Sequence, residues 1–136
     1  MAIKNYTTKV DVYTSVGEIQ SALARAGASK IIVDYDGGKP MAVAFCLNTA
    51  GGMRGFTLPA PVEGTLRVFA SQKIKVDREQ AEKTAWRNIR DWVLAQVSLV
   101  ECCNAPMDQV FLPYLTNNKG QTLFEVYSSG QLMLEA

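Results

Sequence analysis

The sequence has no histidine, three cysteines and no long apolar run, and each absence excludes a class of function. Without histidine the chain cannot form the Ser-His or Cys-His pairs of nucleophilic enzymes, nor most catalytic zinc sites. Cys46, Cys102 and Cys103 show no metal-site or disulfide spacing, which favours a reducing cytosol. Because no apolar run reaches roughly 18 residues, we expect no transmembrane helix. We also expect no signal peptide, since residues 1–15 lack its apolar segment.

An excess of charge of one sign is also missing. The chain has 14 basic and 13 acidic side chains, and a net charge of +1 argues against an indiscriminate polyanion binder. Its 136 residues are 48% hydrophobic and 20% charged, which indicates one soluble globular domain over residues 1–136. Within it, we expect residues 1–76 to be mainly sheet with one helix, and residues 77–136 to be mainly helical.

Several stretches of the first half are typical of strands. "KIIVDY" and "MAVAFCL" are joined by "DGGKP", a strong hairpin signal. The alternation in Lys9 to Tyr13 favours a short strand, and "FTLPAPVEG" reads as a strand broken by prolines. For "TLRVFASQ" we favour a strand over a helix because of its β-branched and aromatic residues.

Capping patterns predict the helices. Ser15 with Glu18 predicts a helix that stops at Gly27. Asp77 with Gln80 precedes a long helix from about residue 78 to 101, a shorter helix follows between prolines 106 and 113, and Thr122 with Glu125 caps a last one. The fold class is therefore α+β: a small, mostly antiparallel sheet with an N-terminal helix and a C-terminal helical region.

The apolar arc of the long helix covers roughly half its circumference, wider than one packing surface needs. The excess predicts a second packing surface, most simply the same helix of another subunit, so we expect the helical region to form a homo-oligomer. The arc consists of Ala81, Ala85, Trp86, Ile89, Trp92, Val93, Gln96, Val97, Leu99 and Val100.

The opposite arc of this helix is polar and has two readings. It could be a solvated face with Glu79–Lys83 and Arg87–Asp91 pairs. It could also bind a ligand, because Asn88 is a poor mid-helix residue whose amide suits a polar ligand edge. A buried Asn88 that bridges to a loop remains open as well. If Asn88 binds a ligand, Asn88→Ala should weaken binding more than it lowers stability.

Other candidate sites give weaker signals. In "GGMRGF", Arg54 and backbone amides could hold a phosphate while Phe56 stacks on a base. Arg25, near the end of the first helix, could contact a ligand or serve the helix dipole. Asp34 and Asp36 could share a face and bind Mg²⁺, although Asp36 also belongs to an Asp-Gly turn.

The ordered set "KIIVDYDGGKPMAVAF", "GFTLPAPVEG", "QAEKTAWRNIRDWVLAQVSLVE", "VFLPYL" and "GQTLFE" resembles a family of phages and prophages, the first class of Thoeris anti-defence proteins. The resemblance covers most of the chain, from about residue 15 to 125. No single motif in this set is diagnostic; the order and spacing carry the likeness.

The resemblance implies a non-enzymatic activity in the host bacterial cytoplasm, with no cofactor and no metal. Members of this family sequester cyclic ADP-ribose isomers made by TIR-domain proteins, some also capture cyclic oligonucleotides of CBASS systems at a separate site, and they assemble through their helices as dimers or larger oligomers. An aromatic residue, an asparagine and arginines contact the ligand in the family, and here Asn88 within "AWRNIRDW" matches. By chemical type and position, the other expected ligand-binding residues are Arg87, Arg90, Thr84, Arg54, Phe56 and Arg25.

Two other function classes remain open. One is a phage accessory module that binds single-stranded nucleic acid through aromatic residues and the basic residues between Arg67 and Arg90. The other is a metal-dependent phosphodiesterase that uses Asp34 and Asp36. Steeply salt-dependent oligonucleotide binding would favour the first, and a requirement for Mg²⁺ would favour the second.

Overall fold

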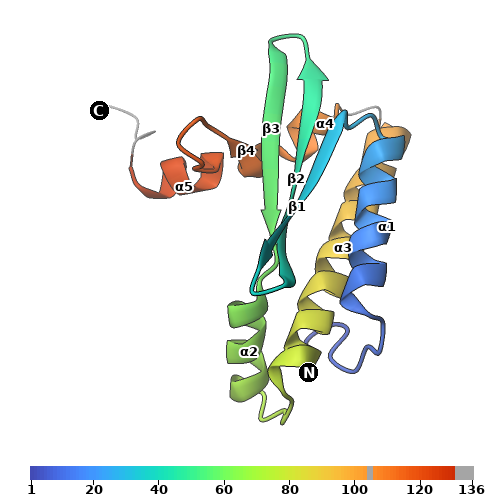
Figure 1. Ribbon diagram of the computed structural model, residues 1–136, viewed down its shortest axis with the longest axis vertical. Helices are drawn as coiled ribbons and strands as arrows, with labels where there is room; N and C mark the ends of the chain where they lie inside the picture. The colour runs from blue at the N-terminus through green and yellow to red at the C-terminus, as the bar shows by residue number, and fades with distance from the viewer. Residues whose placement is uncertain (104–105, 131–136) are drawn as a thin grey trace.

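The computed structural model describes residues 1–103 and 106–130 and confirms the α+β class (Figure 1). An N-terminal helix precedes a four-stranded antiparallel sheet, and helices follow. In chain order the elements are α1 (Val12–Arg25), β1 (Lys30–Asp36), β2 (Lys39–Thr49), β3 (Gly52–Pro59), α2 (Val62–Ser71), α3 (Arg78–Cys103), α4 (Met107–Val110), the 3₁₀ turn η1 (Leu112–Tyr114), β4 (Leu115–Thr116) and α5 (Leu123–Ser128). Among the described residues, no helix is both long and apolar enough to cross a bilayer.

The sheet has the order β1-β2-β3-β4, with every pair antiparallel. The predicted hairpin between β1 and β2 is confirmed. Gly37 and Gly38 both have positive φ, at 60° and 79°, as a tight hairpin turn with right-handed strand twist requires. The glycine-rich stretch that follows is a second hairpin, whose turn is short enough that Arg54 already lies within β3.

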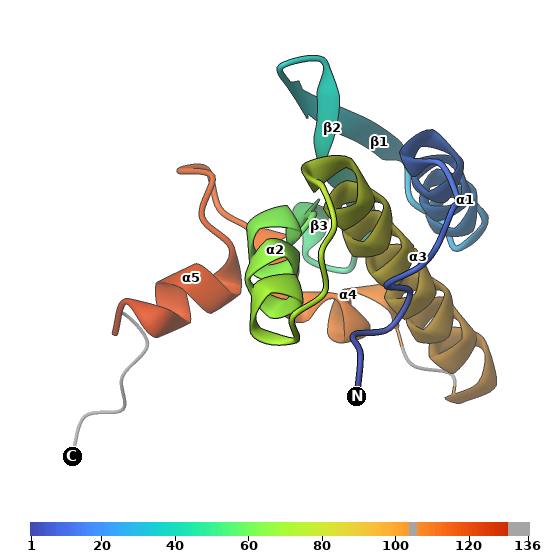
Figure 2. The same cartoon turned by 90° about the horizontal axis from the view of Figure 1, so that it is seen from below.

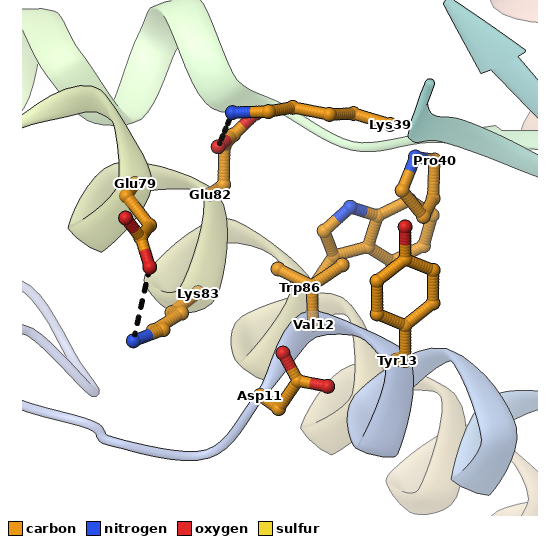
Figure 3. Close-up of a pocket in the computed structure, with 9 residues that line it drawn as sticks. All are labelled: Asp11, Val12, Tyr13, Lys39, Pro40, Glu79, Glu82, Lys83 and Trp86. Carbon is orange, nitrogen blue, oxygen red and sulfur yellow. Dashed lines mark hydrogen bonds and ion pairs between the residues drawn. The ribbon is translucent and has the colours of Figure 1, made fainter.

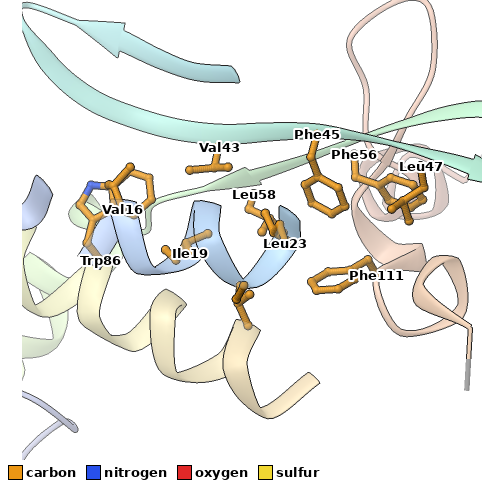
Figure 4. Packing of buried hydrophobic residues seen from close by; sticks show 12 residues of the cluster. Val16, Ile19, Leu23, Val43, Phe45, Leu47, Phe56, Leu58, Trp86 and Phe111 are labelled. Atoms are coloured by element: carbon orange, nitrogen blue, oxygen red, sulfur yellow. The ribbon is translucent and has the colours of Figure 1, made fainter. Parts of the chain in front are cut away.

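One face of the sheet forms the core with α1 and α3 (Figure 4). From the sheet come Val43, Phe45, Leu47, Phe56 and Leu58, all at most 5% exposed. From the helices come Val16, Ile19, Ala22, Leu23, Trp86 and Val93. Since these residues recur every three or four positions along α1 and α3, each helix buries one face against the sheet.

Aromatic rings tie the C-terminal segment to this core. Phe45 stacks on Phe56 with ring centroids 5.3 Å apart, and Phe111 meets Phe45 edge-on at the same distance. Trp92 of α3 in turn packs edge-on against Phe111 and Tyr114. These are the offset and edge-to-face geometries that aromatic pairs prefer. The sheet, α3 and the α4–η1 segment therefore share one aromatic cluster.

The strand predicted for Lys9 to Tyr13 is wrong, because α1 already begins at Val12. Residues 9–11 are irregular, and Asp11 takes the N-cap position without a side-chain capping bond. Val12 and Val16 extend the apolar face of the helix by one turn. This helical spacing outweighs the apolar–polar alternation of Lys9 to Tyr13, from which the strand was predicted. Ser15 is consequently not a cap; it is a buried residue inside the helix.

The strand favoured for "TLRVFASQ" is also wrong, because residues 62–71 form helix α2. Pro61 sits at its N-cap position. Val62, Thr65 and Phe69 are buried at helical spacing, and Val62 and Phe69 form a small second cluster with Ala81 and Ala85 of α3. Burial on α3 therefore decides the conformation against the β-propensity of the residues, which is a weak and context-dependent preference.

Helix α3 packs against α1 along one side and against α2 near its start (Figure 2). The predicted cap is confirmed, since Asp77 Oδ1 accepts a hydrogen bond of 2.9 Å from the backbone N–H of Gln80. The sheet, α1 and α2 cover the first half of the wide apolar arc, so its width there does not require a second subunit. Leu99, in the second half, is 46% exposed.

The remaining helices begin as predicted. Pro106 is the N-cap residue of α4, but Pro113 lies inside η1, beyond the end of that helix. Thr122 and Glu125 form the expected capping box at α5, with reciprocal bonds of 3.1 and 3.2 Å. On α5 the side chains of Phe124 and Tyr127 are 61% and 59% exposed.

Candidate functional site between α1 and α3

The polar face of α3 carries four of the seven predicted ligand-binding residues, Thr84, Arg87, Asn88 and Arg90. This face is not a solvated surface. It lies against α1 on one side and against the N-terminal segment, residues 3–8, on the other. The structure therefore brings these residues together, but it also gives each of them a partner within the chain.

Glu18 of α1 holds both arginines. Its Oε2 accepts hydrogen bonds from Arg87 Nη1 at 2.6 Å and from Arg90 Nε at 3.1 Å. Arg90 Nη1 also donates to Asp91 Oδ1 at 2.9 Å. Partial burial raises the pKa of Glu18, but the hydrogen bonds and charges of the two guanidiniums outweigh it, so the net pKa is lowered. Glu18 is consequently an anion between two cations.

This arrangement corrects one predicted charge pair and one predicted helix cap. The solvated-face reading of α3 paired Arg87 with Asp91, but Arg87 pairs with Glu18 across to α1 instead. Glu18 was expected to cap α1, and it lies inside the helix. The expected pair of Glu79 and Lys83 is confirmed at 3.7 Å.

The N-terminal segment occupies the other side of this face. Asn88 Nδ2 donates to the Lys4 carbonyl at 3.0 Å, and Asn5 Nδ2 donates to Asn88 Oδ1 at 2.8 Å. Thr84 is fully buried, and its hydroxyl donates to the Asn5 carbonyl at 3.0 Å. Of the readings that the sequence left open, the bridge from Asn88 to a loop matches these contacts. The prediction that Thr84 contacts a ligand is corrected, because no part of its side chain is exposed.

Asp91 anchors the same segment electrostatically. Its Oδ2 accepts from Lys4 Nζ at 2.5 Å and from Asn5 Nδ2 at 2.9 Å. Burial raises the pKa of Asp91, but these bonds and the one from Arg90 outweigh it and lower the pKa to about 2. Hydrogen bonds to the ionised form stabilise it, so Asp91 stays charged at neutral pH.

An open groove lies where the outer side of α1 meets α3. Its volume is about 500 Å³, and Arg25 and Arg90 both line it, so the structure joins two predicted residues that are far apart in sequence. Arg25 lies in the last turn of α1, and no described residue pairs with its guanidinium. The remaining lining residues are Tyr13, Thr14, Gly17, Glu18, Ser21 and Leu94. Sequence reasoning missed Tyr13 and Ser21, because the strand predicted for Lys9 to Tyr13 put Tyr13 outside the helix that carries Ser21.

Arg54 and Phe56 do not line this groove. Phe56 is 1% exposed and stacks on Phe45 inside the core, so its ring is not free to stack on a base, and its predicted role is corrected. Arg54 lies near the β2–β3 turn and lines a separate open cavity of about 450 Å³ with residues of β4 and the start of α5. The glycine-rich hairpin and the helix groove are therefore two sites.

The carboxylates and thiols considered for metal binding are scattered. Asp34 and Asp36 are both exposed on β1, and Cys46 lies on β2. Within residues 1–103 and 106–130, no three Asp, Glu, Cys or His side chains gather where they could hold a metal ion. The structure thus brings no further ligand to the aspartate pair.

Comparisons of the chain with protein-family models, with curated proteins and with solved structures found no match.

Proposed function

We propose that this protein binds a cyclic nucleotide signal of the ADP-ribose class in the α1–α3 groove and sequesters it without chemical change, as the resemblance to the first class of Thoeris anti-defence proteins implies. The observation that carries the proposal is the position of Arg25 and Arg90 on the two walls of one groove. Two guanidiniums across a groove suit a pyrophosphate-like anion, because each can donate paired hydrogen bonds to phosphate oxygens.

The size and lining of the groove support such a ligand. About 500 Å³ lies within the range of roughly 300–1,000 Å³ for small-molecule sites. Tyr13, which is 53% exposed, offers a ring for a nucleobase, and Ser21 offers a hydroxyl for a ribose. In this arrangement Tyr13 takes the stacking role that the sequence had assigned to Phe56.

Glu18 gives the groove a resident anion. In the free protein its carboxylate neutralises Arg87 and Arg90. A bound phosphate would replace Glu18 as the partner of Arg90, while Arg87 keeps Glu18 in place. Of the two groove arginines, Arg90 is therefore oriented before the ligand arrives, which lowers the entropic cost of binding.

Capture without turnover requires tight binding rather than catalytic groups. For roughly three dozen heavy atoms at ~0.3 kcal/mol each, the free energy of binding reaches about −11 kcal/mol, on the order of nanomolar affinity. The absence of histidine from the sequence is compatible with a protein that only binds.

We also propose that the protein acts as a homo-oligomer in the host bacterial cytoplasm. Exposed apolar side chains at the second half of α3 and on α5 support self-association, because a second copy would remove them from water. They are Leu99, Phe124 and Tyr127. Light scattering at micromolar concentration tests this part, and a monomer would contradict it.

Isothermal titration against a panel of cyclic ADP-ribose isomers and cyclic oligonucleotides tests the main proposal. We expect saturable binding of at least one isomer, and we expect the ligand to return unaltered after heat denaturation of the protein. Recovery of a cleaved product would overturn sequestration and favour the phosphodiesterase reading, which EDTA and Asp36→Asn would then test. Binding of oligonucleotides alone, with a steep dependence on salt, would favour the nucleic-acid module.

A further inference from the structure

A second, smaller pocket lies on the other side of Tyr13. It is formed by the start of α1, the start of β2 and the first turns of α3, and its volume is about 260 Å³ (Figure 3). Val12, Pro40 and Trp86 give it an apolar floor, and the Tyr13 ring stands at its side. The proposed nucleotide function does not use this pocket.

The indole of Trp86 is the first sign that the pocket has a ligand. Trp86 is 1% exposed, yet none of the described residues accepts a hydrogen bond from its N–H. Every side-chain nitrogen or oxygen that is sealed from solvent in the described part of the chain has a partner. The indole N–H of Trp86 therefore keeps some contact with solvent, and Trp86 lines this pocket. A buried Trp N–H usually has a hydrogen-bond acceptor. A bound molecule with an acceptor atom would supply this partner.

The charged side chains at the mouth of the pocket are the second sign that it has a ligand. Lys39 is paired with Glu82 at 2.9 Å, and Lys83 with Glu79 at 3.7 Å, so both lysines already have counterions. Asp11 has no counterion among the described residues. Although it stands at the N-cap position of α1, its carboxylate makes no capping bond. In Figure 3 this carboxylate and the Lys39–Glu82 pair lie at opposite ends of the view, and the rings of Tyr13 and Trp86 stand to one side of the space between them.

We propose that this pocket binds a small amphipathic amine about the size of one aromatic amino acid. Its ammonium group pairs with Asp11, its ring packs against Tyr13 and Pro40, and its carboxylate or carbonyl oxygen accepts from the Trp86 N–H. A cation is favoured because the mouth carries one unpaired negative charge beside an aromatic face. Since about 260 Å³ falls below the roughly 300–1,000 Å³ of drug-sized sites, the pocket is too small for a cyclic dinucleotide.

Nitrogen-15 NMR of the two tryptophan indole N–H groups tests this proposal, with Trp92→Phe used to assign the signal of Trp86. Three probes separate the two polar contacts: L-phenylalanine has both groups, phenethylamine lacks the carboxylate, and 3-phenylpropionate lacks the amine. We expect L-phenylalanine to shift the Trp86 signal in a saturable way at about millimolar concentration. We expect 3-phenylpropionate to bind about ten-fold more weakly, and Trp92 to be unaffected.

Asp11→Asn isolates the role of the carboxylate. This variant should weaken the binding of L-phenylalanine about ten-fold and leave the binding of 3-phenylpropionate unchanged. The reason is that 3-phenylpropionate has no amine and therefore makes no contact with Asp11 in either protein. Asp34→Asn, at an exposed aspartate of β1 outside the pocket, is the matched control and should change neither. A Trp86 signal that none of the three probes moves would overturn the proposal. Equal binding of L-phenylalanine and 3-phenylpropionate by the unmodified protein would overturn the part assigned to Asp11, whether or not the variant folds.

Discussion

Nδ2 of Asn5 donates a hydrogen bond of 2.8 Å to Oδ1 of Asn88, across 83 residues of sequence. Asn5 has a φ of 63°, a left-handed conformation that asparagine tolerates better than most residues. Asn88 returns a bond to the carbonyl of Lys4. The pair thus fastens an irregular N-terminal segment to the middle of α3, and it accounts for an asparagine inside a helix.

Asn88→Ala should lower the free energy of unfolding by about 1–2 kcal/mol, because it removes two hydrogen bonds from a partly buried site. Urea denaturation measures the loss, and hydrogen exchange at residues 4–8 should become faster. Asn5→Ala serves as the comparison, since it removes the same bond from the other side. If Asn88→Ala leaves stability unchanged and weakens only nucleotide binding, Asn88 is a ligand contact as the resemblance implied.

Phe56→Ala should cost about 3–5 kcal/mol of stability, because it leaves a cavity beside Phe45 in the core. Phe56→Leu should cost much less and leave nucleotide affinity unchanged. Thermal unfolding and titration calorimetry together check this. A stable Phe56→Leu variant that has lost its ligand would instead place the ring in a binding site.

Glu18→Gln should raise the affinity for a phosphate-bearing ligand several-fold, because it removes the anion that competes for Arg90. The stability loss should stay under about 1 kcal/mol, since the Glu18 side chain is 38% exposed and exposed ion pairs contribute little. Glu82→Gln, at an ion pair outside the groove, should leave affinity unchanged. A fall in affinity on Glu18→Gln would mean that the carboxylate contacts the ligand itself.

Arg25→Ala and Arg90→Ala should each weaken nucleotide binding roughly 10- to 100-fold, the range for a hydrogen bond to a charged group. Arg54→Ala is the control, because Arg54 lines a different cavity. Calorimetric titration compares the three. If Arg54→Ala is the variant that loses binding and Arg25→Ala is silent, the ligand binds at the glycine-rich hairpin.

Asp91→Asn should destabilise the protein by about 1 kcal/mol at pH 7, after allowance for the carboxylate's remaining contact with water. The folded pKa of about 2 lies below the ordinary 3.8. The ionised carboxylate therefore contributes its full stabilisation above about pH 4, and the contribution is lost as the pH falls toward 2. Urea denaturation from pH 7 to pH 3 should show the difference between the two proteins shrinking with acid. A difference that grows with acid would contradict the assignment.

Local patterns predicted the parts of the fold that local forces determine. "DGGKP" specifies its hairpin through two glycines at positive φ, and Thr122 with Glu125 specifies the start of α5. In α2, by contrast, β-branched residues suggested a strand, and burial against Ala81 and Ala85 of α3 made it a helix. A single sequence does not reveal that contact, because it arises only after α3 has docked.

The candidate site was predictable only in part for the same reason. Arg25 and Arg90 were chosen by chemical type, and the packing of α1 on α3 brings them to one groove. Glu18 was read as a capping residue, since its partner Arg87 lies 69 residues away. No spacing rule joins residues at that distance. The pocket at Trp86 was missed because a tryptophan at helical spacing reads simply as core.

The attachment of the N-terminal segment to α3 has a consequence for synthesis. Lys4 and Asn5 bond to residues that leave the ribosome more than eighty positions later, so the closing contacts are of long range, and such contacts slow folding. A nascent chain halted before Trp86 also lacks Trp86 and Val93 of α3, which belong to the same core as Leu23 and Phe45. Until α3 emerges, α1 and the sheet therefore expose apolar surface, and this is the interval in which chaperones would bind the growing chain.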